Sequence, residues 1–334
     1  MAKTDRTVPA LQDVARRAGV GAATVSRVIN GGRNVSPKTL ARVTAVIKEL
    51  GYHPSHAAQS LKGTRTRTIG LIVPSVADPF FSSAAAAIQD VARTHGYLVL
   101  LAASNNDPIN EREQMITLIQ RRIDGLILAP SNATDRSLLN ETGFPTICFD
   151  RPIKGTEIAT VLGDNYAGAK AATQHLVEHG CKRILCIGGD PMLFTSKRRF
   201  EGHRAVIRKA GLPYLADFHV QDYASAESAI LAHISRRSPV DAIFSTKNST
   251  TVYAYKILRK LGFSIPGKVA LLGYDDFDLA DALDPPISVI RQPVTQIATK
   301  AAELLFQQME TGEDGRGMTT LKVELVRRAS CGCE

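Results

Sequence analysis

The sequence predicts an N-terminal all-α helix-turn-helix domain with a hinge helix, followed by an α/β core with two lobes. Three observations support this fold class. Apolar residues in the first fifty positions recur at helical spacing. From Ile69 onward, nine short apolar runs alternate with amphipathic helical stretches. The charge is also divided: residues 1–67 hold twelve Lys and Arg against three Asp and Glu, whereas residues 68–334 hold 29 of each. A basic domain on a neutral body is typical of a protein with a polyanionic partner.

The N-terminal domain is expected to begin with two short helices, Leu11–Ala18 and Ala22–Asn30, separated by a turn at residues 19–21. Val25 and Ile29 lie four residues apart on the second helix and would pack against the first. The opposite face is small and polar and consists of Ala23, Ser26, Arg27 and Asn30. An arginine there can donate two hydrogen bonds to guanine O6 and N7, and alanine methyls can only contact a thymine methyl. Taken alone, these residues also fit an ordinary helical hairpin.

A third helix is expected to start at Ser36 and Pro37, an N-cap followed by a first-turn proline, and to end at Gly51. The apolar stripe that completes a three-helix core consists of Val43, Val46, Ile47 and Leu50. After a break at residues 52–54, residues 55–62 are expected to form a hinge helix that is too short to be stable alone. Residues 64–68 form a basic linker and mark the first domain boundary.

The core is expected to contain parallel sheets with right-handed crossovers, because its strand-like runs are separated by single helices. The strand-like runs are Ile69–Val73, Tyr97–Ala102, Gly125–Leu128, Thr146–Phe149, Ile184–Ile187, Phe218–Gln221, Ala242–Ser245, Val269–Gly273 and Ile287–Arg291. The helical stretches are Phe80–His95, Asn110–Arg121, Ala167–His179, Phe200–Ala210, Ala226–Arg236, Thr250–Leu261 and Val294–Met309. Nine strands are too many for one compact doubly wound domain, so two lobes divided near Leu162 and Gly163 are expected.

Membrane and metal sites are not expected. No apolar run approaches the roughly 20 residues of a membrane span, and residues 1–6 are polar without a signal-peptide core, which favours a cytoplasmic protein.

Cys148, Cys181 and Cys186 lie in or beside apolar runs and are expected to be small buried hydrophobic residues. Cys331 and Cys333 offer two metal ligands, but without a nearby His or further Cys in the sequence we expect a disordered tail and no metal site.

A long motif runs through the N-terminal domain. Its parts are Asp13-Val14-Ala15, Ala18-Gly19-Val20, Thr24-Val25-Ser26-Arg27-Val28, Asn30, Val35-Ser36, Leu50-Gly51-Tyr52, Pro54 and Ala58-Gln59-Ser60-Leu61. In this order the segment resembles the LacI/GalR family of bacterial transcription regulators, and the resemblance continues through the rest of the chain. It implies a core that is similar to periplasmic sugar-binding proteins, in which the chain crosses between the lobes near residues 290–292 and again near Thr320.

The resemblance implies three functional parts. Residues 1–54 would be the DNA-binding domain, residues 55–67 the hinge helix and linker, and residues 68–334 the effector-binding and dimerisation core. Within the core, the N-lobe would comprise about 68–162 and 291–320, and the C-lobe about 163–290 and 321–334. The Ala-rich helix at residues 82–92 is a candidate for the dimer interface, with packing inside its own lobe as the alternative.

The resemblance also implies a homodimer whose two second helices read the halves of a pseudo-palindromic operator in successive major grooves. The hinge helices would pair between them, where Leu61 enters the minor groove and kinks the duplex. The residues that match DNA-contacting positions of the family are Leu11, Gly21, Ala22, Ala23, Thr24, Ser26, Arg27, Asn30, Ser36, Tyr52, Ser55, Ala58 and Leu61. Ala22 and Ala23 stand where relatives often place longer polar side chains, so a relative's operator sequence is not transferable.

Small-molecule ligands of open α/β lobes collect outside the carboxyl ends of the strands. The residues there that match effector-contact positions of the family are Phe80, Phe81, Asp150, Arg151, Asp164, Thr195, Arg199, Lys247, Asn248 and Asp275. Carboxylate, guanidinium and amide groups around an aromatic ring suit paired hydroxyls. Asp164 equally fits a helix N-cap, and one of the two phenylalanines is expected to be a core residue. Lys247 stands where the family often has Asn, which predicts a net positive pocket and a sugar acid or sugar phosphate as effector.

The function that these features predict is a repressor of carbohydrate-metabolism genes under allosteric control by a small metabolite, acting at the bacterial nucleoid. No catalytic residue and no cofactor are expected. An enzyme is disfavoured because no Gly-x-Gly-x-x-Gly follows a strand and no P-loop motif occurs. A transport binding protein would need an export signal, and a nucleoid-type structural protein would not need a ligand cleft. The family contains both inducer-released and corepressor-dependent members, so the direction of the response stays open, and a dimer is preferred to a tetramer because no C-terminal leucine heptad follows.

Overall fold

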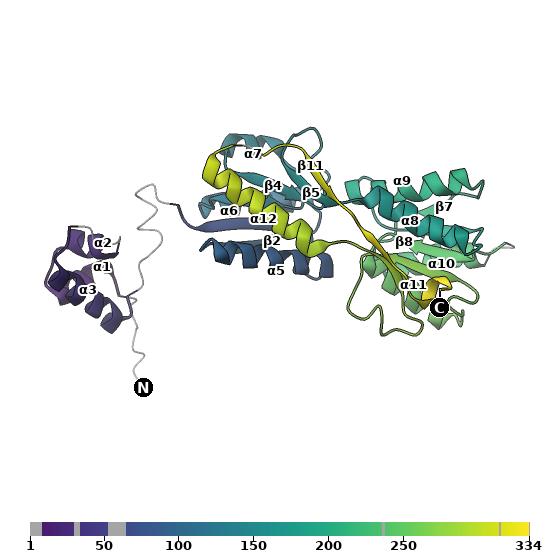
Figure 1. Cartoon of the computed structure of the whole chain (residues 1–334), viewed down its shortest axis with the longest axis horizontal. Coiled ribbons are helices and arrows are strands. Elements are labelled where there is room, and N and C mark those ends of the chain that lie inside the picture. Colours follow the sequence, from purple (N-terminus) through teal and green to yellow (C-terminus); the bar gives the residue numbers. More distant parts are fainter. Residues whose placement is uncertain (1–8, 30–33, 53–64, 236–237, 314, 334) are drawn as a thin grey trace. The chain divides into compact units, whose positions relative to one another are not determined.

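The computed structural model describes residues 9–29, 34–52, 65–235, 238–313 and 315–333. The chain divides into two compact units, Met1–Thr66 and Arg67–Glu334. Figure 1 shows helices alone in the described part of the first unit, and strands covered by helices in the second. This agrees with the predicted fold class. Among the described residues, no helix combines the length and the apolar character that crossing a bilayer requires.

The first unit is a three-helix domain made of α1 (Leu11–Ala18), α2 (Ala22–Ile29) and α3 (Pro37–Leu50). Its core is built around Val14, Val25 and Val43, which are fully buried. The termini follow local signals: the Ser36 hydroxyl accepts a hydrogen bond from the Thr39 backbone N at 3.3 Å, and Gly51 ends α3 with φ +60°. The predicted hinge helix at residues 55–62 lies outside the described residues.

The N-lobe of the second unit is a parallel six-stranded sheet in the order β11-β5-β4-β3-β1-β2. Its strands are β1 (Thr68–Val73), β2 (Leu98–Ala103), β3 (Gly125–Leu128), β4 (Thr146–Phe149), β5 (Thr160–Gly163) and β11 (Met318–Leu321). Its helices are α5 (Pro79–Thr94), α6 (Pro108–Gln120), α7 (Arg136–Thr142) and α12 (Val294–Thr311). The alanine face of α5, with Ala84, Ala87 and Ala92, is buried in the core of this lobe.

The C-lobe is a second six-stranded sheet in the order β12-β10-β9-β8-β6-β7. Its strands are β6 (Ile184–Ile187), β7 (Leu215–Asp217), β8 (Ala242–Ser245), β9 (Ala270–Tyr274), β10 (Ser288–Arg291) and β12 (Glu324–Val326), the last of which is antiparallel to β10. Its helices are α8 (Asn165–Glu178), α9 (Phe194–Lys209), α10 (Tyr223–Ile234), α11 (Asn248–Lys260) and the 3-10 turn η1 (Ala329–Cys331).

The chain passes between the lobes three times: from β5 to α8, from β10 to α12, and from β11 to β12. The third passage is the yellow segment that runs from one sheet to the other in Figure 1. In each lobe, the strand that comes first in the sequence (β1 or β6) lies between the next two strands of that lobe. This reversal of strand order is where doubly wound sheets bind ligands, beyond the carboxyl ends of the strands.

Two expectations for the core were wrong. The strand expected at Phe218–Gln221 is instead β7, at Leu215–Asp217. Phe218 and Val220 resemble strand residues because both pack against the core outside the strand: Phe218 is partly buried, with its ring edge-on against Phe200 at 4.4 Å, and Val220 is 3% exposed. The C-terminal tail, expected to be disordered, forms η1 with Ser330 and Cys331 buried.

Candidate effector cleft and DNA-reading helix

A cavity of about 480 Å³ lies between the lobes of the second unit, at the carboxyl ends of strands from both sheets. Eight of the ten predicted effector residues line it: Phe80, Phe81, Asp150, Arg151, Thr195, Arg199, Lys247 and Asp275. Asn248 lies at its edge, where its side-chain amide donates a hydrogen bond to the Asp78 carboxylate at 3.3 Å. Asp164 is not among the residues that line the cavity. Its carboxylate accepts from the Ala167 backbone N at 2.9 Å and caps α8, the alternative role that the sequence allowed.

Arg199 is the most extensively bonded cation of the cleft. Its Nε donates to Asn165 Oδ1 at 2.7 Å, and its Nη1 donates to the Thr246 carbonyl at 2.7 Å and to Asp275 Oδ2 at 3.1 Å. The guanidinium also lies 3.7 Å above the Tyr274 ring. Because only 6% of this residue is exposed, the C-lobe holds its guanidinium in one position before any ligand arrives.

Left-handed backbone conformations are concentrated at the cleft. Of the seven non-glycine residues with positive φ in the described part of the chain, four line it: Asn105, Asn106, Asp150 and Asp275. Asp150 directly follows β4 and Asp275 directly follows β9, with φ values of +66° and +68°. Such conformations cost about 1–3 kcal/mol each and cluster at binding sites, where the surrounding structure enforces them. Asp150 and Asp275 therefore line the cavity from the carboxyl ends of β4 and β9.

The expected net positive charge is not found. Among the described residues that line the cavity, the cations are Arg151, Arg199 and Lys247, and the acids are Asp78, Asp150, Asp190 and Asp275. Each cation has a carboxylate within 4 Å: Arg199–Asp275 at 3.1 Å, Arg151–Asp150 at 3.4 Å and Lys247–Asp78 at 3.6 Å. The expectation was wrong because Asp78 and Asp190, which it did not count, also face the cavity.

The phenylalanines form one apolar side of the cleft. Phe80 and Phe81 are 6% and 8% exposed, and their rings meet edge to face at 5.0 Å. The expectation that one of the two belongs to the core understated their burial, because both pack into the N-lobe core and both line the cavity. They offer a flat apolar surface beside fixed hydrogen-bonding groups, which is the arrangement expected for a ring with hydroxyls.

Three of the cleft residues outside the predicted set make hydrogen bonds that hold the site together. Asp78 caps α5 by accepting from the Phe80 backbone N at 3.1 Å, Asn106 Oδ1 accepts from Arg151 Nη2 at 2.9 Å, and Gln292 Nε2 donates to Asp275 Oδ1 at 2.7 Å. Asp78 had a readable signal, the Asp-Pro pair after the first strand. Asn106 and Gln292 had the same positional signal as Asp150 and Asp275, because Asn106 lies three residues after β2 and Gln292 directly follows β10.

Stability should depend on pH through Asp150. Burial raises the pKa of this carboxyl to about 6, against an opposing effect of Arg151 and Arg199, while Asp275 and Asp78 raise it further. The folded chain then binds more protons than the unfolded chain between pH about 4 and about 6, so we expect the free energy of unfolding to fall as the pH rises through that window. Urea unfolding should show an Asp150 contribution on the order of 2–3 kcal/mol. Asp150→Asn should flatten the profile, and an unchanged profile would contradict the assignment.

In the first unit, α2 presents the predicted DNA-reading face. Five of the predicted residues are exposed: Gly21, Ala22, Ala23, Arg27 and Ser36. Leu11, Thr24 and Ser26 are partly buried. Tyr52 is only 6% exposed and packs into the three-helix core, so its side chain has a structural role. Asn30, Ser55, Ala58 and Leu61 lie outside the described residues.

Comparison with known proteins matches both units. Residues 10–55 fit the family model of bacterial regulatory proteins of the lacI family, and residues 66–328 fit that of periplasmic binding proteins and the sugar-binding domain of the LacI family. The ribose operon repressor of Halalkalibacterium halodurans is 33% identical over 303 residues, which cover 90% of each chain. The structure of a complex of the transcriptional regulator CelR with cellobiose is 31% identical and covers 96% of this chain and 99% of its own, with a TM-score of 0.73.

The fold also matches the lac repressor dimer bound to operator and the anti-inducer ONPF. That structure has a TM-score of 0.84 at 24% identity and covers 97% of this chain and 99% of its own. The relatives named here are transcriptional regulators.

Proposed function

The chain belongs to the LacI family of bacterial regulatory proteins, and from this we propose that it is a transcriptional repressor controlled by a neutral sugar. The sugar binds in the cleft between the lobes and changes the affinity of the N-terminal domain for its operator. The protein acts as a homodimer on a pseudo-palindromic DNA site in the bacterial cytoplasm and has no enzymatic activity. The observation that carries the choice of effector is that every cation lining the cleft is already paired with a carboxylate.

The charges in the cleft favour a neutral ligand over an anion. An anionic ligand would have to displace a carboxylate from Arg151 or Arg199, both of which are buried with their partners. It would also stand close to the negative charges of Asp78 and Asp275. A neutral polyhydroxyl compound avoids both costs, because its hydroxyls donate to the carboxylates and accept from the guanidinium and amide groups.

Two polar atoms in the cleft support this assignment. Arg151 Nε is buried and has only its 3.4 Å ion-pair contact with Asp150, and Gln292 Oε1 is buried without a hydrogen bond from any residue that the structure describes. One is a donor and the other an acceptor, and a sugar hydroxyl can serve either. The names of two relatives point to the same chemical class, since one is a ribose operon repressor and another was solved with cellobiose.

Effector control would operate through movement of the lobes. The cleft has N-lobe groups such as Asp78 and Asp150 on one side and C-lobe groups such as Arg199 and Asp275 on the other, so a ligand that bonds both sides favours a closed arrangement. The three crossovers are the segments that must bend. In a homodimer this closure alters the separation of the two DNA-binding domains. A coupling of about 1–3 kcal/mol changes operator affinity several-fold to a hundredfold, and the operator changes sugar affinity by the same factor.

A thermal-shift panel of neutral sugars, sugar acids and sugar phosphates tests the choice of effector. A neutral sugar at a hundredfold its Kd should stabilise the protein by about 2.7 kcal/mol, and the corresponding acid or phosphate should have little effect. Operator affinity is then measured by fluorescence anisotropy with and without the sugar that binds. Asp275→Ala is the control that should not respond. Stabilisation by acids or phosphates alone would reject the neutral-sugar assignment.

A further inference from the structure

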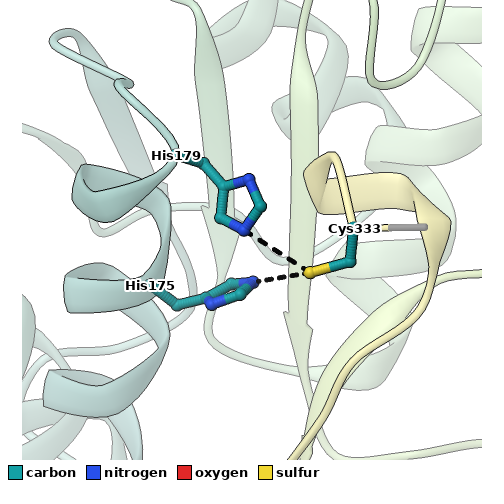
Figure 2. Close-up of side chains that lie close together, drawn as sticks. All are labelled: His175, His179 and Cys333. Carbon is teal, nitrogen blue, oxygen red and sulfur yellow. Dashed lines mark hydrogen bonds between the residues drawn. The ribbon is translucent and has the colours of Figure 1, made fainter.

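The C-terminal segment returns to helix α8 of the C-lobe and places sulfur beside two imidazoles. After β12 the chain forms η1, turns at Gly332 with φ +96°, and brings Cys333 next to His175 and His179. Figure 2 shows both histidine rings, His175 from the last turn of α8 and His179 from its C-cap, directed at the Cys333 sulfur. The histidines are four residues apart, so they share one face of the helix. The two histidines are 158 and 154 positions from Cys333 in the sequence, so the expectation of no metal site, which considered only neighbours in the sequence, did not include them.

The distances between these atoms fit a metal ion. His175 Nε2 and His179 Nε2 are each 3.4 Å from Cys333 Sγ, and these three atoms all lie within 4.8 Å of one another. Cys331 Sγ is 3.2 Å from His175 Nε2 and 3.6 Å from Cys333 Sγ but is not part of this three-residue group, so it would have to move toward His179 to complete a tetrahedron. With Zn–S of about 2.3 Å and Zn–N of about 2.0–2.1 Å, neighbouring ligand atoms of a tetrahedral zinc site stand roughly 3.3–3.8 Å apart. The four contacts of 3.2–3.6 Å are close to that range.

We propose that the chain binds one Zn²⁺ through His175 Nε2, His179 Nε2 and Cys333 Sγ, with Cys331 Sγ as the fourth ligand. Two imidazoles and two thiolates are the ligand set of structural zinc sites, and this soft set disfavours Mg²⁺ and Ca²⁺. Ser288 Oγ lies 3.0 Å from Cys331 Sγ and would orient that ligand by a hydrogen bond. The site is closed by four protein ligands, which is typical of a structural site.

The zinc site is separate from the effector cleft. Asn165, which bonds Arg199 in the cleft, and His175 are ten residues apart on α8, which corresponds to about 15 Å along the helix axis. The metal would instead connect the end of the third crossover to helix α8 of the C-lobe. β12 pairs with β10 through only three residue pairs, and the zinc ligands follow it within seven residues. The segment that follows β11 passes from the N-lobe to the C-lobe. A bound zinc ion would therefore anchor the end of this segment to the C-lobe.

The test uses the full chain, purified under reducing conditions and titrated with Zn²⁺ and with Co²⁺. We expect one metal ion per chain by elemental mass spectrometry, and for Co²⁺ the intense visible bands of tetrahedral coordination together with a thiolate-to-metal charge-transfer band. His179→Ala and Cys333→Ser should each weaken Zn²⁺ binding roughly a hundredfold or more and abolish the tetrahedral spectrum. His179 is exposed, so its replacement should leave the fold intact, which circular dichroism checks. A chelator should lower the unfolding midpoint of the wild-type chain and leave that of His179→Ala unchanged.

Cys181→Ser is the matched control, because Cys181 is a free thiol three residues after the end of α8 and is not one of the proposed ligands. It should keep the full stoichiometry and spectrum. Loss of binding in Cys181→Ser, a pale octahedral Co²⁺ spectrum, or absence of stoichiometric metal would overturn the proposal. So would a Cys331–Cys333 disulfide in chain isolated with alkylation of free thiols. Cys331→Ser should also lose the tetrahedral spectrum, and its retention would reject Cys331 as the fourth ligand.

Discussion

Arg199→Ala should abolish the effector response and lower the free energy of unfolding by about 3–5 kcal/mol. The variant leaves Asp275 buried without its ion-pair partner, and it leaves Asn165 Oδ1 and the Thr246 carbonyl without the hydrogen bonds that Arg199 donates. Unfolding in urea gives the loss of stability, and calorimetry with the sugar found in the panel gives the loss of binding. Operator binding without sugar should persist at temperatures where the core is folded.

Two further variants separate the contributions at this site. Arg198→Ala is the matched control, because Arg198 is adjacent, partly exposed and paired with Glu201 at 2.6 Å, and its loss should cost less than about 1 kcal/mol. The double variant Arg199→Ala with Asp275→Ala should lose less stability than the sum of the two single variants, because no unpaired charge remains. Strict additivity, or normal sugar binding in Arg199→Ala, would mean that this ion pair is not the centre of the effector site.

Arg27→Ala should weaken operator binding by about 1–3 kcal/mol per subunit, and by roughly 2–6 kcal/mol in a dimer that uses two copies. Arg27 is exposed on α2, beside Ala23, and has no hydrogen bond or ion pair with any residue the structure describes, so its guanidinium is available to a base. Selection from randomised duplexes should show relaxed preference at one position of each half-site, and anisotropy at constant salt gives the loss of affinity.

Arg16→Ala provides the comparison on the same domain. Arg16 lies on α1, is 79% exposed and stands 3.7 Å from Asp13. Its loss should reduce binding equally for all sequences, with a smaller salt dependence and no change in the preferred site. If Arg27→Ala behaves in the same uniform way, Arg27 contacts phosphate and does not read a base.

The elements of the N-terminal domain could be predicted because their signals are local. Ser36 followed by Pro37 starts α3, and the glycines at 19 and 51 end α1 and α3 with left-handed conformations. The core strands with continuous apolar runs were equally readable, since strands such as β3 and β8 are buried along their whole length. Three strands were not predicted: the edge strands β11 and β12, which are exposed or only partly buried, and β5, which is buried along its whole length.

The location of the candidate effector site could be predicted from the sequence, but its net charge could not. Residues that directly follow a strand, such as Asp150 and Asp275, are placed by the carboxyl-end rule. The ion pairs that decide the charge join distant segments: Lys247 and Asp78 belong to different lobes and lie 169 positions apart in the sequence. The proposed zinc ligands could not be predicted for a similar reason. His175 and Cys333 are 158 positions apart in the sequence and come together only when the last strand pairs with the C-lobe.

The third crossover also determines when the sensor can fold during synthesis. β11 completes the N-lobe sheet beside β5, and α12 supplies Ile297, Ala301 and Leu305 to the same core, although both elements follow all of the C-lobe except β12 and η1. At about 5–20 residues per second, the ribosome needs roughly 10–30 s after β5 to deliver them. A nascent chain therefore carries an N-terminal three-helix unit well before it has a complete sugar sensor. Truncation after the first unit and before residue 318 removes β11 from the N-lobe sheet and β12 from the C-lobe sheet, so the shortened chain keeps the three-helix unit while neither lobe is complete.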